Sequence, residues 1–126
     1  MRLLFDTHLL IWLGTQPDRF PSGLLDEIES TETLFSPISI WEIAIKFAKR
    51  RDDFPYDPTV VAQRLLDAGW VELSFEIHHA VAVGALPEIH GDPFDRALVA
   101  QAQVEELTLV TADRQLADYP ATIRLL

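Results

Sequence analysis

The sequence has 126 residues, which fits one compact domain, since single domains commonly have about 100 to 150 residues. Its hydrophobic content of 48% excludes a disordered chain, and the absence of cysteine excludes disulfides and thiolate metal sites. The formal net charge of −10 argues against tight non-specific binding to nucleic acid, because such binding depends on Lys and Arg. We therefore expect a single folded domain, residues 1–126, in the reducing cytoplasm.

Short apolar runs alternate with amphipathic stretches along the whole chain. In chain order, the pattern predicts a strand at 2–5, helices at 7–13 and 24–30, a strand at 33–36, a helix that begins after Pro37 and ends by Asp53, a helix at 58–68, a strand at 71–75, helices at 78–86 and 93–106, a strand at 107–111 and an edge strand at 122–125. These repeated units predict an α/β fold, with a central parallel sheet and helices on both faces.

The apolar residues near the start do not indicate a membrane segment. The stretch 3–13 is interrupted by Asp6 and His8, and it is shorter than the roughly 20 apolar residues that a membrane span needs. It also lacks the small-residue cleavage site of a signal peptide. We expect neither a signal peptide nor a membrane anchor.

Three acidic residues come shortly after predicted strands. Asp6 follows the first strand, Glu42 lies in the first turn after the second, and Asp113 follows the strand at 107–111. The carboxyl ends of parallel strands meet at one edge of a sheet, where ligands bind. Two carboxylates about 5 Å apart repel by roughly 3 kcal/mol at an effective dielectric of about 20. Their convergence therefore predicts a divalent cation, and carboxylates suit Mg²⁺.

Each of these acids could instead have a structural role. Asp6 could cap the first helix, and Asp113 could cap a short terminal helix. Ser39 and Glu42 match the spacing of a capping box, and Glu42 could also pair with Lys46 one turn later. Capping and spacing alone do not establish a site.

A further acidic pair begins the helix at 93–106. The Asp92-Pro93 dipeptide is typical of a helix start, so we interpret Asp92 as the cap rather than as a metal ligand. Asp95, three residues later, would be stabilised by the helix dipole. Arg96 could steady the acids or bind a substrate phosphate, or it could be a solvated surface arginine.

Two other clusters have simpler interpretations. Lys46, Lys49, Arg50 and Arg51 form the only basic run; such runs are usually the solvated face of a helix, although this one could guide RNA. Zinc is rejected because the remaining candidate ligands match no usual ligand spacing. Those candidates are His78, His79, Glu88 and His90.

Four segments in order along the chain carry a specific resemblance. They are Leu-Leu-Phe-Asp-Thr-His at 3–8, Ser-Ile-Trp-Glu-Ile-Ala-Ile-Lys at 39–46, Asp-Pro-Phe-Asp-Arg-Ala-Leu-Val-Ala-Gln-Ala at 92–102, and Leu-Val-Thr-Ala-Asp at 109–113. With these segments the chain resembles the PIN-domain ribonucleases, specifically VapC-type toxins. The resemblance implies an α/β/α sandwich.

The resemblance also implies a site. Asp6, Glu42, Asp95 and Asp113 would be the catalytic, metal-binding acids, and the assignment of Asp95 depends on the resemblance because no predicted strand precedes it directly. The hydroxyls of Thr7 and Thr111 could orient an acid or a metal-bound water. These two residues and Arg96 are secondary site residues beside the four acids.

The activity implied is hydrolysis of RNA phosphodiester bonds with one or two Mg²⁺ or Mn²⁺ ions. The implied partners are a cognate antitoxin and a second copy of the chain in a homodimer. Trp12, Phe20 and Leu24 could line an apolar groove for the antitoxin, although core packing is the more common fate of such side chains.

Three other functions remain open from the sequence. A nuclease directed at DNA or at a nucleic-acid structure would use the same acids. A catalytically inactive PIN-like module could bind protein or RNA instead. A phosphatase is disfavoured, because the Asp-x-Asp arrangement of a phosphoaspartate mechanism does not follow the first strand.

Overall fold

A computed structural model describes residues 2–126. It contains five strands, which are β1 (Arg2–Phe5), β2 (Glu32–Phe35), β3 (Val71–Glu72), β4 (Thr108–Thr111) and β5 (Thr122–Leu125). The α-helices are α1 (Thr7–Thr15), α2 (Ser22–Ser30), α3 (Pro37–Ala48), α4 (Pro58–Asp67), α5 (Ile77–Ala85) and α6 (Pro93–Glu105). Two short 3-10 helices are η1 (Pro17–Arg19) and η2 (Arg114–Asp118).

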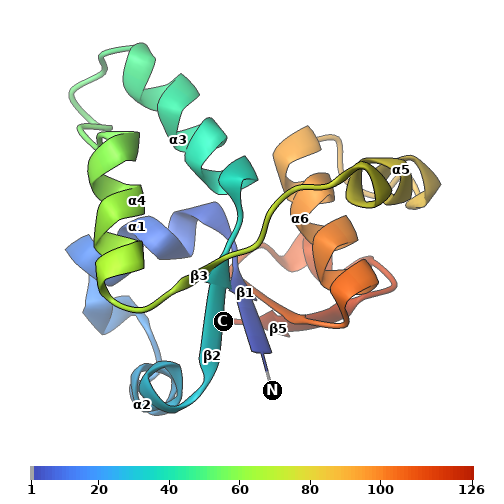
Figure 1. Cartoon of the computed structure of the whole chain (residues 1–126), viewed down its shortest axis with the longest axis horizontal. Helices are drawn as coiled ribbons and strands as arrows, with labels where there is room; N and C mark the ends of the chain where they lie inside the picture. The colour runs from blue at the N-terminus through green and yellow to red at the C-terminus, as the bar shows by residue number, and fades with distance from the viewer. Residues whose placement is uncertain (1) are drawn as a thin grey trace.

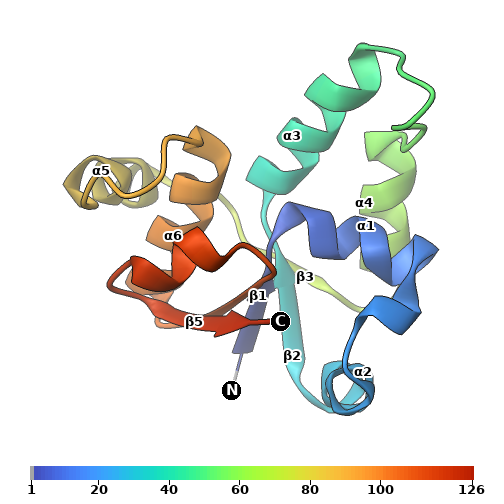
Figure 2. The same cartoon turned by 180° about the vertical axis from the view of Figure 1, so that it is seen from behind.

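All five strands are parallel and form one sheet in the order β3-β2-β1-β4-β5. Because parallel neighbours need a crossover, a helix follows each central strand. Helices α1, α2 and α4 lie on one side of the sheet and α5 and α6 on the other (Figures 1 and 2). The predicted three-layer α/β fold is confirmed.

The alternation of side chains along β1 divides the core in two. Leu3 and Phe5 pack with α1, α2 and α4, whereas Leu4 between them packs with α6 on the opposite face. All three side chains are fully buried. A central strand covered on both faces must be apolar at every position, which is why residues 3–5 lack a polar side chain.

The structure shortens one predicted strand. The sequence suggested a strand at 71–75, but β3 ends at Glu72. It is an edge strand with β2 as its single neighbour. The side chain of Gln101 then donates to the carbonyl oxygens of Leu73 and Ser74, both at 3.3 Å, and replaces the partner that a longer ladder would supply.

The predicted capping box of Ser39 and Glu42 is wrong. Helix α3 begins earlier, with Ser36 as its N-cap: the Ser36 hydroxyl accepts from the backbone N–H of Ile38 at 3.1 Å. Pro37 is the first helical residue, where its missing N–H costs nothing. Glu42 consequently lies in the second turn of α3, and its alternative pairing with Lys46 is the one observed.

None of the helices in residues 2–126 is long and apolar enough to cross a membrane.

Candidate active site

The carboxylate of Asp6 is held at the end of β1 by two donors. Its Oδ1 accepts from the backbone N–H of Thr7 at 2.7 Å, and its Oδ2 accepts from the hydroxyl of Thr111 at 2.7 Å. Only 4% of Asp6 is exposed, and burial raises the pKa of this carboxyl while the two hydrogen bonds oppose the shift. Asp6 caps α1 and still presents a buried carboxylate at the carboxyl edge of the sheet.

Glu42 has an oxygen with no donor. Its Oε2 pairs with Nζ of Lys46 at 3.1 Å, but its Oε1 is buried and finds no hydrogen-bond partner among residues 2–126. Burying an unpaired acceptor costs on the order of 1 to 3 kcal/mol, and more for a charged group. A buried carboxylate oxygen without a donor is a suitable ligand for a cation, and a divalent cation would satisfy it.

Asp92 is the helix cap that the sequence predicted. Its Oδ1 accepts from the backbone N–H groups of Phe94 at 2.8 Å and Asp95 at 3.3 Å. This leaves Asp95 in the first turn of α6, with its carboxyl free to face the other acids.

Asp95 carries the clearest sign of crowded negative charge. Burial, the largest cause, and the neighbouring charges of Asp6, Asp92, Glu42 and Asp113 together raise the pKa of Asp95 to about 8. A carboxyl in this environment holds its proton at neutral pH unless a cation compensates its charge. Asp95 therefore lies among the acids, although it comes from a helix and not from a strand end.

Asp113 has both oxygens occupied. As predicted, it caps a short helix: Oδ1 accepts from the backbone N–H of Gln115 at 3.0 Å at the start of η2. Its Oδ2 lies 3.0 Å from Nε2 of His90. The backbone N–H of Asp113 donates to the Thr111 hydroxyl at 3.0 Å, so Thr111 links Asp113 to Asp6.

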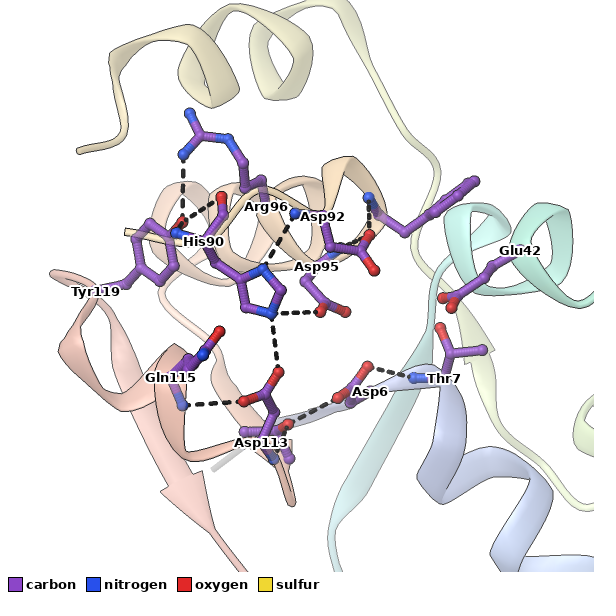
Figure 3. A network of polar contacts seen from close by, with 12 residues as sticks. Asp6, Thr7, Glu42, His90, Asp92, Asp95, Arg96, Asp113, Gln115 and Tyr119 are labelled. Carbon is purple, nitrogen blue, oxygen red and sulfur yellow. Dashed lines mark hydrogen bonds and ion pairs between the residues drawn. The ribbon is translucent and has the colours of Figure 1, made fainter. Parts of the chain in front are cut away.

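Figure 3 shows the carboxylates of Asp6, Glu42, Asp95 and Asp113 around one space. Asp6 directly follows β1, Glu42 lies in α3, Asp95 lies in α6, and Asp113 directly precedes η2. The tightest group of metal-ligand atoms there consists of His90, Asp95 and Asp113, whose ligand atoms all lie within 4.8 Å of one another. Oxygen donors dominate this set, which matches the preference of Mg²⁺ or Mn²⁺.

The secondary residues behave differently from one another. The Thr111 hydroxyl does contact an acid, Asp6. The Thr7 hydroxyl donates instead to the Ser39 hydroxyl at 2.9 Å, so it ties α1 to α3.

Arg96 points away from the acids in this structure. Its guanidinium donates to the carbonyl oxygens of Val83 at 3.0 Å and Pro87 at 2.9 Å and to the Tyr119 hydroxyl at 3.2 Å. The interpretation of Arg96 as a solvated surface side chain does not hold, since these bonds tie α6 to α5, to the segment that follows α5 and to Tyr119.

His90 is the site residue that the sequence analysis missed. It was considered only as a zinc ligand, because no motif spacing connects it with Asp113. The available signal was its place two residues before the helix cap Asp92.

His78 and His79 form a separate pair on α5. Nε2 of buried His79 lies 2.8 Å from Glu105, and Nε2 of His78 lies 3.3 Å from the same oxygen. Nδ1 of His79 accepts from the backbone N–H of Glu76, so Nε2 carries the hydrogen and donates to Glu105. A donor cannot also be a zinc ligand, and the bond lowers the pKa of Glu105. The cluster fastens α5 to α6.

Two depressions adjoin α1. One, of about 350 Å³, is lined by the basic side chains of Lys46, Lys49 and Arg51 together with His8, Phe54 and Asp53, the last of which pairs with Arg51. The other is an apolar groove of about 300 Å³ between α1 and α4. Of the proposed groove residues, Phe20 and Leu24 are buried in the core, and Trp12 stacks beneath Arg19; none of them lines this groove.

Comparison with known proteins places this arrangement in a family. The model of the PIN domain matches residues 3–121. The chain belongs to the PIN-domain family. A search of curated proteins finds no match.

Solved structures share the PIN fold of this chain. A chain of VapBC2 from Rickettsia felis, bound to a DNA fragment from the promoter, is 14% identical with a TM-score of 0.77, covering 100% of this chain and 99% of that one. DNA-bound VapBC from Salmonella typhimurium is 17% identical with a TM-score of 0.72, covering 100% and 97%. A toxin–antitoxin complex from Klebsiella pneumoniae is 21% identical with a TM-score of 0.66, covering 97% and 95%. At these identities the similarity shows the PIN-like fold.

Proposed function

We propose that this PIN domain is a metal-dependent endoribonuclease and the toxin component of a toxin–antitoxin pair that acts in the cytoplasm. The observation that carries the proposal is the meeting of four carboxylates, with a buried unpaired oxygen on Glu42 and a pKa near 8 on Asp95. Four carboxylates this close destabilise the fold when no cation is bound. A role in binding a cation explains their presence better than a role in stability does.

Asp6, Glu42, Asp95 and Asp113 would hold one or two Mg²⁺ or Mn²⁺ ions. A bound ion supplies positive charge where a phosphodiester hydrolysis develops negative charge on the attacking and leaving oxygens. The chain itself orients the ligands: Thr111 and the N–H of Thr7 hold Asp6, and Lys46 holds one oxygen of Glu42. Asp95 would release its proton to solvent on becoming a ligand.

RNA is the proposed substrate, and the basic depression offers it a path to the acids. Lys46 contacts Glu42 and also lines the depression, so the two sites adjoin. Lys49 is exposed and makes no ion pair within residues 2–126, which leaves its charge available for a phosphate. Phe54 in the same depression provides an aromatic face, and unpaired bases stack on such faces.

A cognate antitoxin is the proposed protein partner. The structures with this fold include a toxin–antitoxin complex and VapBC complexes, and the apolar groove between α1 and α4 could take a helix or an extended segment. We also propose a homodimer. Ile77 and Val81, one turn apart on α5, are 84% and 70% exposed, which is unusual for large apolar side chains unless a partner covers them.

One experiment tests the enzymatic proposal directly. Purified protein is incubated with matched RNA and DNA strands, with Mg²⁺ and with a chelator. We expect cleavage of RNA only, dependent on the ion, and none by Asp6→Asn. This variant keeps the shape of Asp6 and accepts the Thr7 hydrogen bond, so an unchanged melting temperature serves as its control. Cleavage that persists in chelator, or in Asp6→Asn, would overturn the metal role.

The same assay separates the other candidates. Cutting of DNA alone would indicate a DNA-directed nuclease with the same acids. Mg²⁺ binding without cleavage of either strand would indicate a binding module. If RNA is cut, mapping the new 5′ ends after induced expression would identify the target sequence.

A further inference from the structure

His90 enters the acidic site from the loop between α5 and α6. Its Nε2 lies 3.0 Å from Oδ2 of Asp113 and 3.4 Å from Oδ2 of Asp95 (Figure 3). The imidazole thereby joins Asp95 near the start of α6 to Asp113 at the start of η2, two acids that are 18 residues apart in the chain. Its side chain is 18% exposed, so packing in the core does not explain its position.

The hydrogen bonds define which nitrogen carries the hydrogen. Nδ1 lies 3.1 Å from the backbone N–H of Asp92, and a backbone N–H can only donate. Nδ1 is therefore the acceptor, and Nε2 bears the N–H. It follows that His90 faces the two carboxylates as a donor, not as a lone pair that could bind a metal.

The backbone of His90 is held on both sides by one side chain. The Tyr119 hydroxyl accepts from the N–H of His90 at 2.8 Å and donates to its carbonyl oxygen at 3.3 Å. Arg96 donates to the same hydroxyl at 3.2 Å and to the carbonyl oxygen of Pro87. The loop is thus fastened at three points around His90, so the ring has a defined direction.

We propose that His90 is a positioning residue that holds Asp113 and Asp95 in the orientation in which their carboxylates bind the divalent ion. The inference rests on the proposed metal site. Asp113 shows the effect most clearly, because Gln115 holds one of its oxygens and His90 the other. A carboxylate fixed in this way loses less freedom when it becomes a ligand, and partners of metal ligands typically contribute about 10-fold to 100-fold in affinity.

The test is a calorimetric titration of the metal-free full-length protein with Mg²⁺, without RNA. We expect His90→Ala to weaken Mg²⁺ binding about 10-fold. His90→Gln should retain most of the affinity, because its amide nitrogen can donate from nearly the same place as Nε2. Tyr119→Phe, which removes the hydroxyl that fastens the loop, should weaken binding less than His90→Ala. His78→Ala is the control and should bind as the wild type does.

A ligand role for His90 is the competing outcome, since its ligand atom lies within 4.8 Å of those of Asp95 and Asp113. Electron spin echo spectroscopy of bound Mn²⁺ distinguishes the two: a directly bound nitrogen would overturn the positioning role, and its absence supports it. Wild-type affinity in His90→Ala would also overturn it. Wild-type protein that binds Mg²⁺ but leaves RNA intact would overturn only the ribonuclease proposal, because neither readout uses RNA.

Discussion

The hydroxyl of Thr111 donates to Oδ2 of Asp6 at 2.7 Å, across 105 residues of sequence. Both side chains are buried at the carboxyl ends of the neighbouring strands β4 and β1. The same hydroxyl accepts from the backbone N–H of Asp113 at 3.0 Å. One threonine therefore sets the relative position of two acids of the candidate site.

Thr111→Val should destabilise the protein and loosen the site. Valine keeps the shape but removes the hydroxyl, which leaves Oδ2 of Asp6 and the N–H of Asp113 without a partner. We expect the free energy of unfolding to fall by about 1 to 3 kcal/mol, measured by urea denaturation. Thr108→Val, at the other end of β4, makes the same chemical change where residues 2–126 provide the hydroxyl with no hydrogen bond. An equal loss in both variants would contradict this role of Thr111.

The metal-free protein should be less stable at pH 8 than at pH 5. The pKa of Asp95 is about 8 in the folded chain and near its ordinary value of 3.8 in the unfolded chain. Between these values the folded state binds more protons than the unfolded state, so the free energy of unfolding falls as the pH rises. Thermal melting in chelator at the two pH values measures this difference.

Asp95→Asn is the control for that pH dependence. It removes the titrating group, so the difference in melting temperature between pH 5 and pH 8 should shrink. Added Mg²⁺ should also stabilise the wild type more at pH 8 than at pH 5, because the ion competes with the proton on Asp95. A wild type whose melting temperature rises from pH 5 to pH 8 in chelator would argue against the crowded, protonated Asp95.

Lys49→Ala should weaken RNA binding and its dependence on salt. Binding of a fluorescent single-stranded oligoribonucleotide is measured in the Asp6→Asn background, where no cleavage is expected. If Lys49 contacts one phosphate, the slope of log affinity against log salt should fall by about 0.7. Arg64→Ala removes an exposed cation outside the basic depression and should leave the slope unchanged. Equal slopes for the Asp6→Asn background, for Lys49→Ala and for Arg64→Ala would show that Lys49 does not contact an RNA phosphate.

Gly14→Trp should block antitoxin binding without unfolding the chain. Gly14 lines the apolar groove on α1, and a Cβ there would meet no atom within 4 Å. Because these surroundings are open, an indole at this position would meet no steric clash at its Cβ. It would then occupy the groove that Gly14 lines. Co-expression with the small protein encoded next to the gene, followed by co-purification, measures the effect. Gly23→Trp on α2 has equally open surroundings, lies outside the groove lining and should still co-purify with that partner.

Much of the fold follows from local patterns in the sequence. The strands β1 and β5 begin and end where they were predicted, because alternation and apolar runs depend on neighbouring residues alone. The caps Asp92 and Asp113 were also recognisable, since each accepts from an N–H group only two residues later. The ends of predicted strands indicated Asp6, Glu42 and Asp113 as candidates, whereas Asp95 was chosen from the resemblance to PIN-domain ribonucleases.

The errors in prediction occurred where distant segments meet. Ser39 resembles a helix cap locally, but its hydroxyl is bound to Thr7 from α1, and Ser36 begins the helix instead. Phe20 and Leu24, by contrast, were expected in the core more often than in a groove, and both are buried there.

The sequence by itself determined the α/β order, because short-range spacing and residue type encode helices and strands, and its family resemblance supplied the four candidate acids. Only the tertiary structure decided how those acids are held. Tyr119 lies 29 residues from His90 in the chain, yet its hydroxyl directs that imidazole towards Asp113. No local pattern encodes such a contact, since it exists only after η2 and the loop before α6 have packed beside the same edge of the sheet.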